Sequence, residues 1–231
     1  MPSLFSQAAN RVLTNAQRVQ SLILPNRKGN GIKVNHENPQ YTWRDLEGEI
    51  RPREVGVGAP ALTVFRDSQR QYAFVVNDIV DITFHWPHDI VPGSEAYIHT
   101  HWGHNGTSIS GSLVLSYRHT YAKGHGVYTF PADKTLTHTI SGLTISNAPQ
   151  YVHRIDEIRL VAPSGETPTA NEYSADNLEV DGILLVSLQV TGVPTISGGG
   201  STRPFLFYSD IHYLSTNIGT LNRAPDFYLP T

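Results

Sequence analysis

Hydrophobic and polar residues alternate with a period of two over much of the chain. The clearest examples are the segments 80–86 (VDITFHW) and 95–102 (EAYIHTHW). In these segments Ile82, Phe84 and Ile98 occupy hydrophobic positions with polar residues on either side. This period is that of a β-strand with one buried face.

Similar segments recur along the rest of the chain, separated by turns rich in Gly, Pro, Asn and Ser. They are residues 71–76, 110–122, 125–131, 134–146, 150–162, 178–192 and 203–215. This number and spacing of short strands predict an all-β protein, an antiparallel β-sandwich of jelly-roll type. A larger immunoglobulin-like sandwich fits the same pattern.

The first 40 residues follow a different pattern. Residues 3–24 allow one weak amphipathic helix, and residues 25–40 (PNRKGNGIKVNHENPQ) interrupt every periodicity with Pro, Gly and Asn. Such a weak helix is not stable alone, so we interpret residues 1–40 as an N-terminal arm that packs on a neighbour or along the surface. An ordinary first helix of the domain is the alternative. Residues 41–231 then form the jelly-roll domain.

Composition narrows the class of function. Charged residues make up only 16% of the chain and the formal net charge is -3, so nucleic acid is not expected as a partner. The chain has no cysteine, which excludes disulfides and thiolate metal sites. The first residues contain no continuous apolar core of the kind a secretory signal has. No segment approaches the roughly 18 apolar residues of a membrane span, so we expect no membrane contact.

The histidines suggest a metal site. Six of the eleven lie between residues 80 and 121, and His99 and His101 point to the same face of one predicted strand. If segments 80–86 and 95–102 pair as an antiparallel hairpin, Asp81 lies opposite His101. His99, His101 and Asp81 are therefore the candidate ligands for a divalent metal. No other cofactor is expected.

The alternative interpretation is a polar strand face used for hydrogen bonding at a subunit interface. Its members would be His99, His101, His85 and Tyr97. His104 and Asn105 belong to the sequence HNGTS, where Asn-Gly indicates an exposed turn tip. No catalytic residue is expected, because the chain has no G-x-S-x-G nucleophile motif, and SGGGS (197–201) lacks the lysine of a phosphate-binding loop.

Gly93, His99 and His101, spaced Gly-x5-His-x-His, resemble the first metal motif of the cupins, a jelly-roll family. That motif continues with a glutamate four or five residues after the second histidine. This chain has Asn105 there and no acidic residue before Asp133. The second cupin motif is also missing, so the resemblance ends at the first histidines.

A broader resemblance covers residues 41–231. It rests on YTWRDLEGEIRPR (41–53) followed by GVGAPALTVFR (56–66), on FHWPHDIVPGSEAYIHTHW (84–102) and on FYSDIHYLSTNIGTLNRAPDFY (207–228). In these segments the chain is similar to virion structural proteins of tailed bacteriophages. The resemblance implies a non-enzymatic capsid-surface decoration, collar or fibre-base subunit, made in the cytoplasm of the bacterial host and incorporated into the virion.

The partners implied are further copies of the chain, as a trimer or another cyclic oligomer, and other virion proteins such as capsid, portal or tail proteins. Two alternatives remain open. One is a receptor- or glycan-binding sandwich in which Trp102, His104, Asn105 and the loop 197–201 face the ligand. The other is a cupin-like metal-dependent enzyme built on His99 and His101.

Overall fold

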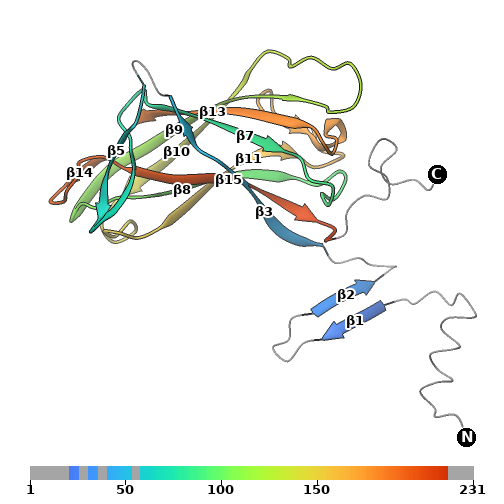
Figure 1. Ribbon diagram of the computed structural model, residues 1–231, viewed down its shortest axis with the longest axis horizontal. Coiled ribbons are helices and arrows are strands. Elements are labelled where there is room, and N and C mark those ends of the chain that lie inside the picture. The colour runs from blue at the N-terminus through green and yellow to red at the C-terminus, as the bar shows by residue number, and fades with distance from the viewer. Residues whose placement is uncertain (1–20, 26–30, 36–40, 54–57, 218–231) are drawn as a thin grey trace, which may run out of the picture. The chain divides into compact units, whose positions relative to one another are not determined.

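The computed structural model describes residues 21–25, 31–35, 41–53 and 58–217 (Figure 1). The chain divides into two compact units, residues 1–41 and 42–231. In the first unit β1 (Ser21–Pro25) and β2 (Gly31–Asn35) form an antiparallel two-stranded sheet of their own. The second unit contains all the other described elements and is called the sandwich below.

The sandwich consists of two sheets packed face to face (Figure 1). The β9 sheet has the strand order β10-β9-β13-β7-β4, with β14 also paired to β9. Its strands are β4 (Arg51–Pro52), β7 (Ile79–His85), β9 (Ser108–Ala122), β10 (Lys134–Leu143), β13 (Ile183–Gly192) and β14 (Thr195–Ser197).

The β8 sheet has the order β12-β11-β8-β15-β6-β5, with β3 also paired to β15. Its strands are β3 (Thr42–Gly48), β5 (Ala61–Arg66), β6 (Gln69–Ala73), β8 (Ala96–Gly103), β11 (Arg154–Ala162), β12 (Tyr173–Ser174) and β15 (Phe205–Ser215). A short 3₁₀ helix, η1 (Ala175–Asn177), follows β12.

The strand pairing is that of a jelly roll, which confirms the predicted fold class. Eight strands, β6, β7, β8, β9, β10, β11, β13 and β15, pair in a nested order in which the first joins the last. Thus β6 pairs with β15, β7 with β13, β8 with β11, and β9 with β10, all antiparallel. Successive strands therefore cross repeatedly between the two sheets.

The core lies between the sheets and is made by the inward positions of each strand. Phe84, Trp86, Ile98 and Trp102 are all buried there, as the alternating pattern predicted. Burial of apolar side chains of this size contributes about 1.5–3 kcal/mol each relative to exposure. The pattern along the segments 80–86 and 95–102 thus identified the inward face correctly.

The predicted hairpin between β7 and β8 is wrong. β7 pairs with β13 and β4 in one sheet, and β8 pairs with β11 and β15 in the other. Residues 86–95 cross from sheet to sheet between them. The alternation of a strand determines which side chains face inward, but it does not determine which strand lies beside it.

Two further expectations differ from the structure. Residues 125–131, predicted as a strand, contain no strand and belong to a long loop between β9 and β10. The predicted helix over residues 3–24 fails at its end, where Ser21–Pro25 forms β1, and its first part lies outside the described residues. The C-terminal residues 218–231 also lie outside them.

Candidate functional site

A cluster of imidazoles and carboxylates lies on the outer face of the β8 sheet. Ile98, Thr100 and Trp102 of β8 point into the core, and the alternating residues between them, among them His99 and His101, point outward. The prediction that these two histidines point to the same face of one strand is thus correct.

A β-bulge in β15 brings a carboxylate beside them. The register between β15 and β8 shifts between Leu206 and Tyr208. Leu206 faces the core, so regular alternation would also turn Tyr208 and Asp210 inward. The extra residue reverses the alternation, and Asp210 and His212 face outward instead.

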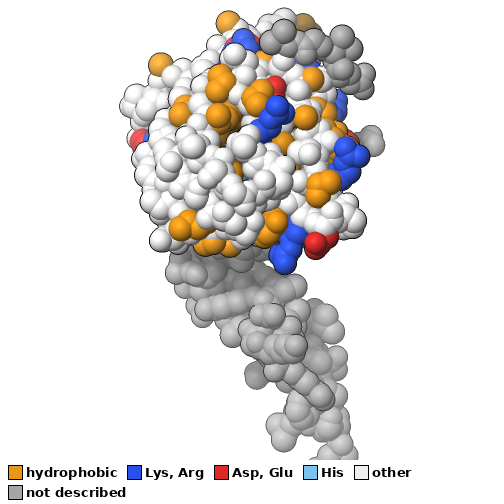
Figure 2. Space-filling model, turned by 90° about the vertical axis from the view of Figure 1, so that its left-hand side faces the viewer, with side chains coloured by type: hydrophobic (Ala, Val, Ile, Leu, Met, Phe, Trp, Pro, Cys, Tyr) orange, Lys and Arg blue, Asp and Glu red, His pale blue; other side chains and the backbone are white. Residues whose placement is uncertain are grey.

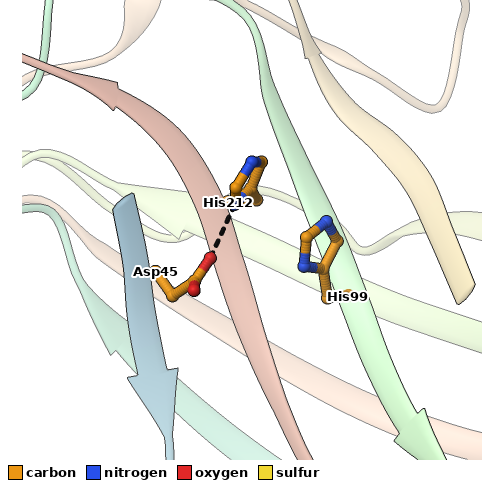
Figure 3. Close-up of side chains that lie close together, drawn as sticks. All are labelled: Asp45, His99 and His212. Carbon is orange, nitrogen blue, oxygen red and sulfur yellow. Dashed lines mark hydrogen bonds and ion pairs between the residues drawn. The ribbon is translucent and has the colours of Figure 1, made fainter. Parts of the chain in front are cut away.

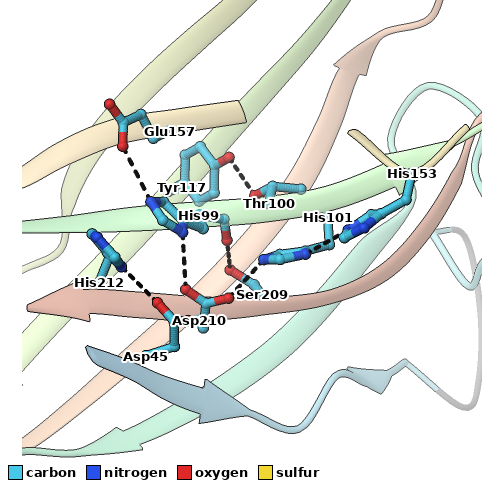
Figure 4. Close-up of polar contacts among 10 residues, drawn as sticks. All are labelled: Asp45, His99, Thr100, His101, Tyr117, His153, Glu157, Ser209, Asp210 and His212. Atoms are coloured by element: carbon cyan, nitrogen blue, oxygen red, sulfur yellow. Dashed lines mark hydrogen bonds and ion pairs between the residues drawn. The ribbon is translucent and has the colours of Figure 1, made fainter. Parts of the chain in front are cut away.

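The cross-strand register then completes the cluster. Asp210 lies opposite His99, and on its other side β3 places Asp45 opposite His212. Glu157 of β11 lies opposite His99 from the other direction. Four strands, β11, β8, β15 and β3, therefore contribute to one row of polar side chains (Figure 4).

Asp210 is the centre of this row. Its side chain is only 1% exposed, and its Oδ2 lies 2.7 Å from His101 Nε2. Its Oδ1 lies 3.2 Å from His99 Nδ1, but the approach lacks hydrogen-bond geometry. Among the described residues Oδ1 has no hydrogen-bond partner, so one oxygen of a buried carboxylate is left unsatisfied.

The remaining ring nitrogens of both histidines also have partners. His99 Nε2 lies 3.1 Å from Glu157 Oε2, and His101 Nδ1 lies 2.7 Å from His153 Nε2 (Figure 4). Contacts at both nitrogens fix the orientation of each ring. From the inner side, the Ser209 hydroxyl donates a hydrogen bond to the His99 carbonyl at 2.5 Å.

A second acid–imidazole pair lies next to the first. Asp45 Oδ1 is 2.6 Å from His212 Nδ1 (Figure 3). The His212 ring stacks on His99 on one side, with centroids 4.5 Å apart, and on Trp43 on the other, at 4.8 Å. Trp43 itself is 43% exposed.

Stacked rings also cover His101. Tyr208 lies over it at a centroid distance of 3.9 Å, and His153 lies at 4.8 Å on a nearly parallel plane. These rings cover His101, which is buried although it points away from the core. The low polarity of such surroundings strengthens the electrostatic interactions inside the cluster.

The two central histidines have opposite electrostatic environments. The neighbouring Asp210 carboxylate raises the pKa of His99, and Glu157 acts in the same direction. Burial lowers the pKa of His101 and outweighs its contact with Asp210. Directly beneath them Thr100 and Tyr117 share a buried hydrogen bond of 2.7 Å that joins the two sheets.

Two groups in this cluster have ligand atoms close enough to share a metal ion. One comprises His99, His101 and Asp210, and the other comprises Asp45, His99 and His212. In each group the ligand atoms lie within 4.8 Å of one another. Both use His99, so the two groups would compete for one imidazole.

Asp81, the third predicted ligand, is not part of the cluster. It lies on β7, on the outer face of the other sheet, where it accepts a hydrogen bond of 2.5 Å from the Ser187 hydroxyl. Asp81 was predicted as a ligand because a β7–β8 hairpin would place it opposite His101. The two strands do not pair, so Asp81 and His101 lie on different sheets. His85 lies at the end of β7, 3.4 Å from the Asp181 carboxylate. Tyr97 lies on the outer face of β8 with its ring against Trp43.

The other predicted contact residues are buried. Trp102 donates a hydrogen bond to Asp156, His104 Nε2 lies 2.7 Å from the Ala148 carbonyl, and Asn105 donates to the Val64 carbonyl. The exposed tip predicted for His104 and Asn105 is therefore wrong. The reason is that β8 and β9 belong to different sheets, so the Asn-Gly segment lies in a crossover and not in a hairpin turn.

Sequence reasoning missed Asp210, His212, Asp45, His153 and Glu157. One signal was available, because Asp210-x-His212 has the same i, i+2 spacing as His99-x-His101. The sequence did not predict that β8, β15 and β3 are adjacent, because these strands are far apart along the chain.

No protein-family model matches the chain, and no curated protein matches it either. Within the described ranges, no helix has the length and apolar character needed to cross a membrane.

Proposed function

We propose that this chain is a non-enzymatic structural subunit of a tailed-bacteriophage virion. In this proposal it is a capsid-surface decoration, collar or fibre-base subunit made in the host cytoplasm. It acts through protein–protein contacts, forming a trimer or another cyclic oligomer that binds other virion proteins. The sequence resemblance over residues 41–231 suggests this role, and features of the fold support it.

The observation that carries the proposal is the separate N-terminal unit. Its strands β1 and β2 form a two-stranded sheet, and none of the described residues adds a third strand to it. Two-stranded sheets are marginally stable in water, and they gain stability when they pack on a further surface. A neighbouring subunit supplies such a surface, as expected for an arm in an assembly.

A second feature is an apolar loop on the sandwich. Residues 123–133 form the long loop between β9 and β10, drawn in yellow-green in Figure 1. Val127 in this loop is fully exposed, and Tyr128 and Phe130 are about half exposed. Three large apolar side chains at one exposed loop are typical of a contact with another protein.

Exposed apolar side chains occur elsewhere in smaller groups. Figure 2 shows the end of the sandwich at which β5 and β14 lie, where hydrophobic side chains are scattered among polar ones. Leu62 and Val64 of β5 are exposed to a similar degree as Phe130. Single exposed apolar residues are common on protein surfaces, so the 123–133 loop is the better candidate contact.

The test uses the full chain and a loop variant. Size-exclusion chromatography with light scattering should give the mass of a trimer or another closed oligomer. The double variant Tyr128→Ser/Phe130→Ser should shift the mass toward the monomer. Ile145→Ser, which changes an exposed residue after β10, is the matched control and should leave the mass unchanged.

A wild-type chain that stays monomeric at high concentration would contradict the proposal. Mass spectrometry of purified phage particles provides the second test, and the chain should be present at a stoichiometry fixed by the symmetry of the particle. An oligomeric chain whose mass the loop variant does not change would remove the loop from the contact but retain the assembly role.

The structure does not favour the alternative of a glycan-binding sandwich, because most of the residues proposed to contact the ligand are not accessible. Trp102, His104 and Asn105 are buried and hydrogen-bonded inside the sandwich, so they do not face a ligand. Of that set only the loop 197–201 is largely exposed.

A further inference from the structure

We propose that His99, His101 and Asp210 form a binding site for one divalent transition-metal ion, of which Zn²⁺ is the best match. The inference is independent of the assembly role. It rests on the donor atoms, on the contacts behind them and on the unsatisfied oxygen of Asp210.

The ligand atoms of the three residues lie within 4.8 Å of one another. His99 Nδ1 lies 3.2 Å from Asp210 Oδ1, and His101 Nε2 lies 2.7 Å from Asp210 Oδ2. Two ligands bound at about 2.0–2.1 Å in a tetrahedral site lie roughly 3.3 Å apart. The separation of His99 Nδ1 from Oδ1 already fits an ion bound by that oxygen, and the His101 ring has to move away from Oδ2 for its Nε2 to bind the same ion.

The outer contacts are those that metal-bound histidines need. A ligating imidazole donates the N–H of its other nitrogen to an acceptor, which fixes the tautomer. His99 Nε2 lies beside Glu157 Oε2, and His101 Nδ1 lies beside His153 Nε2. With these hydrogen bonds in place, His99 Nδ1 and His101 Nε2 present their lone pairs toward Asp210.

Asp210 Oδ1 is the independent observation that points to an ion. Leaving an oxygen of a buried carboxylate without a hydrogen-bond partner is costly. A cation between Oδ1 and the two imidazole nitrogens would satisfy it. Two neutral nitrogens and one carboxylate are a donor set that suits Zn²⁺ and similar borderline ions better than Mg²⁺ or Ca²⁺, which prefer oxygen.

The second candidate group, Asp45, His99 and His212, is less suitable. Asp45 is 57% exposed, and its carboxylate is already paired with His212 at 2.6 Å. The site proposed here uses the buried carboxylate, and Asp45 serves to distinguish the two groups experimentally.

The experiment is a calorimetric titration of the full chain with ZnCl₂ after treatment with EDTA, using protein without a histidine tag. The wild type should bind one Zn²⁺ per chain with micromolar or tighter affinity. Asp210→Asn keeps the side-chain shape but removes the charge of a ligand, and it should weaken binding by more than the roughly 10–100-fold that the loss of an outer contact costs. Glu157→Gln should weaken binding about 10-fold through the orientation of His99.

Two matched controls complete the design. His138→Gln changes a histidine on β10, in the other sheet, and should leave the affinity unchanged. Asp45→Asn should also leave it unchanged. If Asp45→Asn weakens binding as much as Asp210→Asn does, the ion belongs to the second group and the proposed site is wrong.

If circular dichroism shows that Asp210→Asn does not fold, the proposed site is tested on the wild type alone. Zn²⁺ should then shift the ring resonances of His99 and His101 in the NMR spectrum, while those of His138 stay in place. Absence of Zn²⁺ binding to the wild type at millimolar concentration, or shifts confined to other histidines, would overturn the site.

Discussion

His119 is a buried histidine on β9, remote from the outer-face cluster. Its side chain packs in the sandwich, and its Nδ1 lies 3.1 Å from the Tyr173 hydroxyl. Burial lowers the pKa of His119 to about 4, and the nearby Lys134 acts in the same direction while Asp133 opposes it. The folded protein therefore keeps this ring neutral over a pH range in which the unfolded chain binds a proton.

The consequence is an acid-sensitive stability. Above about pH 6.5 the ring is neutral in both states, and His119 then contributes no pH dependence. As the pH falls from about 6.5 toward 4, the unfolded state gains a proton and the folded state does not, so the free energy of unfolding decreases. The upper limit of the loss is about 3 kcal/mol, at about 1.4 kcal/mol per pKa unit.

Urea unfolding of the wild type and of His119→Gln at about pH 7 and about pH 4.5 measures this effect. The variant should be less stable than the wild type at the higher pH and should lose less stability on acidification. Equal losses in the two proteins would show that another group governs the acid response.

Single residues also mark the limit of prediction from sequence. The pattern His99-x-His101 correctly predicted two imidazoles on one face, because a strand turns alternate side chains the same way. Asp210 could not be assigned to them, since its direction depends on a bulge that reverses the alternation of β15. The carboxylate chosen instead, Asp81, followed from an incorrect strand pairing.

Several elements are joined at one carboxylate, Asp181, which precedes β13. His88 and His85 lie 2.8 and 3.4 Å from Asp181 Oδ1, and His125 lies 2.8 Å from Oδ2. The three histidines come from the end of β7, from the segment that follows it and from the loop after β9. Hydrogen bonding by His125 lowers the pKa of Asp181.

Asp181→Asn should therefore lower the free energy of unfolding, because it weakens the contacts that join these elements. Asparagine tolerates the left-handed backbone of this position, where φ is 64°, so the change removes the charge with little backbone strain. Because the folded pKa of Asp181 is lowered, its contribution is complete above the unfolded value of about 3.9 and is lost as the pH falls through the folded value. The partly exposed carboxylate should contribute about 1 kcal/mol near neutral pH.

Chemical denaturation of the wild type and the variant over a pH series measures this contribution. The difference between the two proteins should be present near neutral pH and should shrink at the acid end of the series. A difference that stays constant with pH would show that the amide disturbs packing and that the charge has no part in the effect.

The period-two pattern of the sequence located most of the strands, but it did not predict which strands pair with each other. The segments for β7, β8, β9 and β15 were recognised, because each alternates over many residues. The 125–131 segment, also predicted as a strand, contains none, and its apolar residues Val127, Tyr128 and Phe130 are exposed. Alternation is a local property, whereas membership of a sheet depends on long-range pairing.

The jelly roll as a whole was predictable from the number and spacing of its strands. The position of its last strand, β15, affects how the chain can fold. β15 is a central strand of the β8 sheet, and it pairs with β8, β6 and β3. The nested order means that β6 has no partner on this side until β15 has been synthesised. Pairing of such distant segments is slow, because the loop must close before the contacts form.

We therefore expect that the sandwich cannot fold before its last strand is available. A chain that ends after Pro204 lacks β15 and leaves β8, β6 and β3 with unpaired edges next to an open core. It should show no cooperative thermal transition and should bind a hydrophobic dye, whereas a chain that ends after Asn217 retains β15 and should unfold cooperatively. Near-UV circular dichroism and differential scanning calorimetry distinguish the two states. A cooperative transition in the shorter chain would mean that the remaining strands form a stable core without β15, and folding would then not depend on the closing strand.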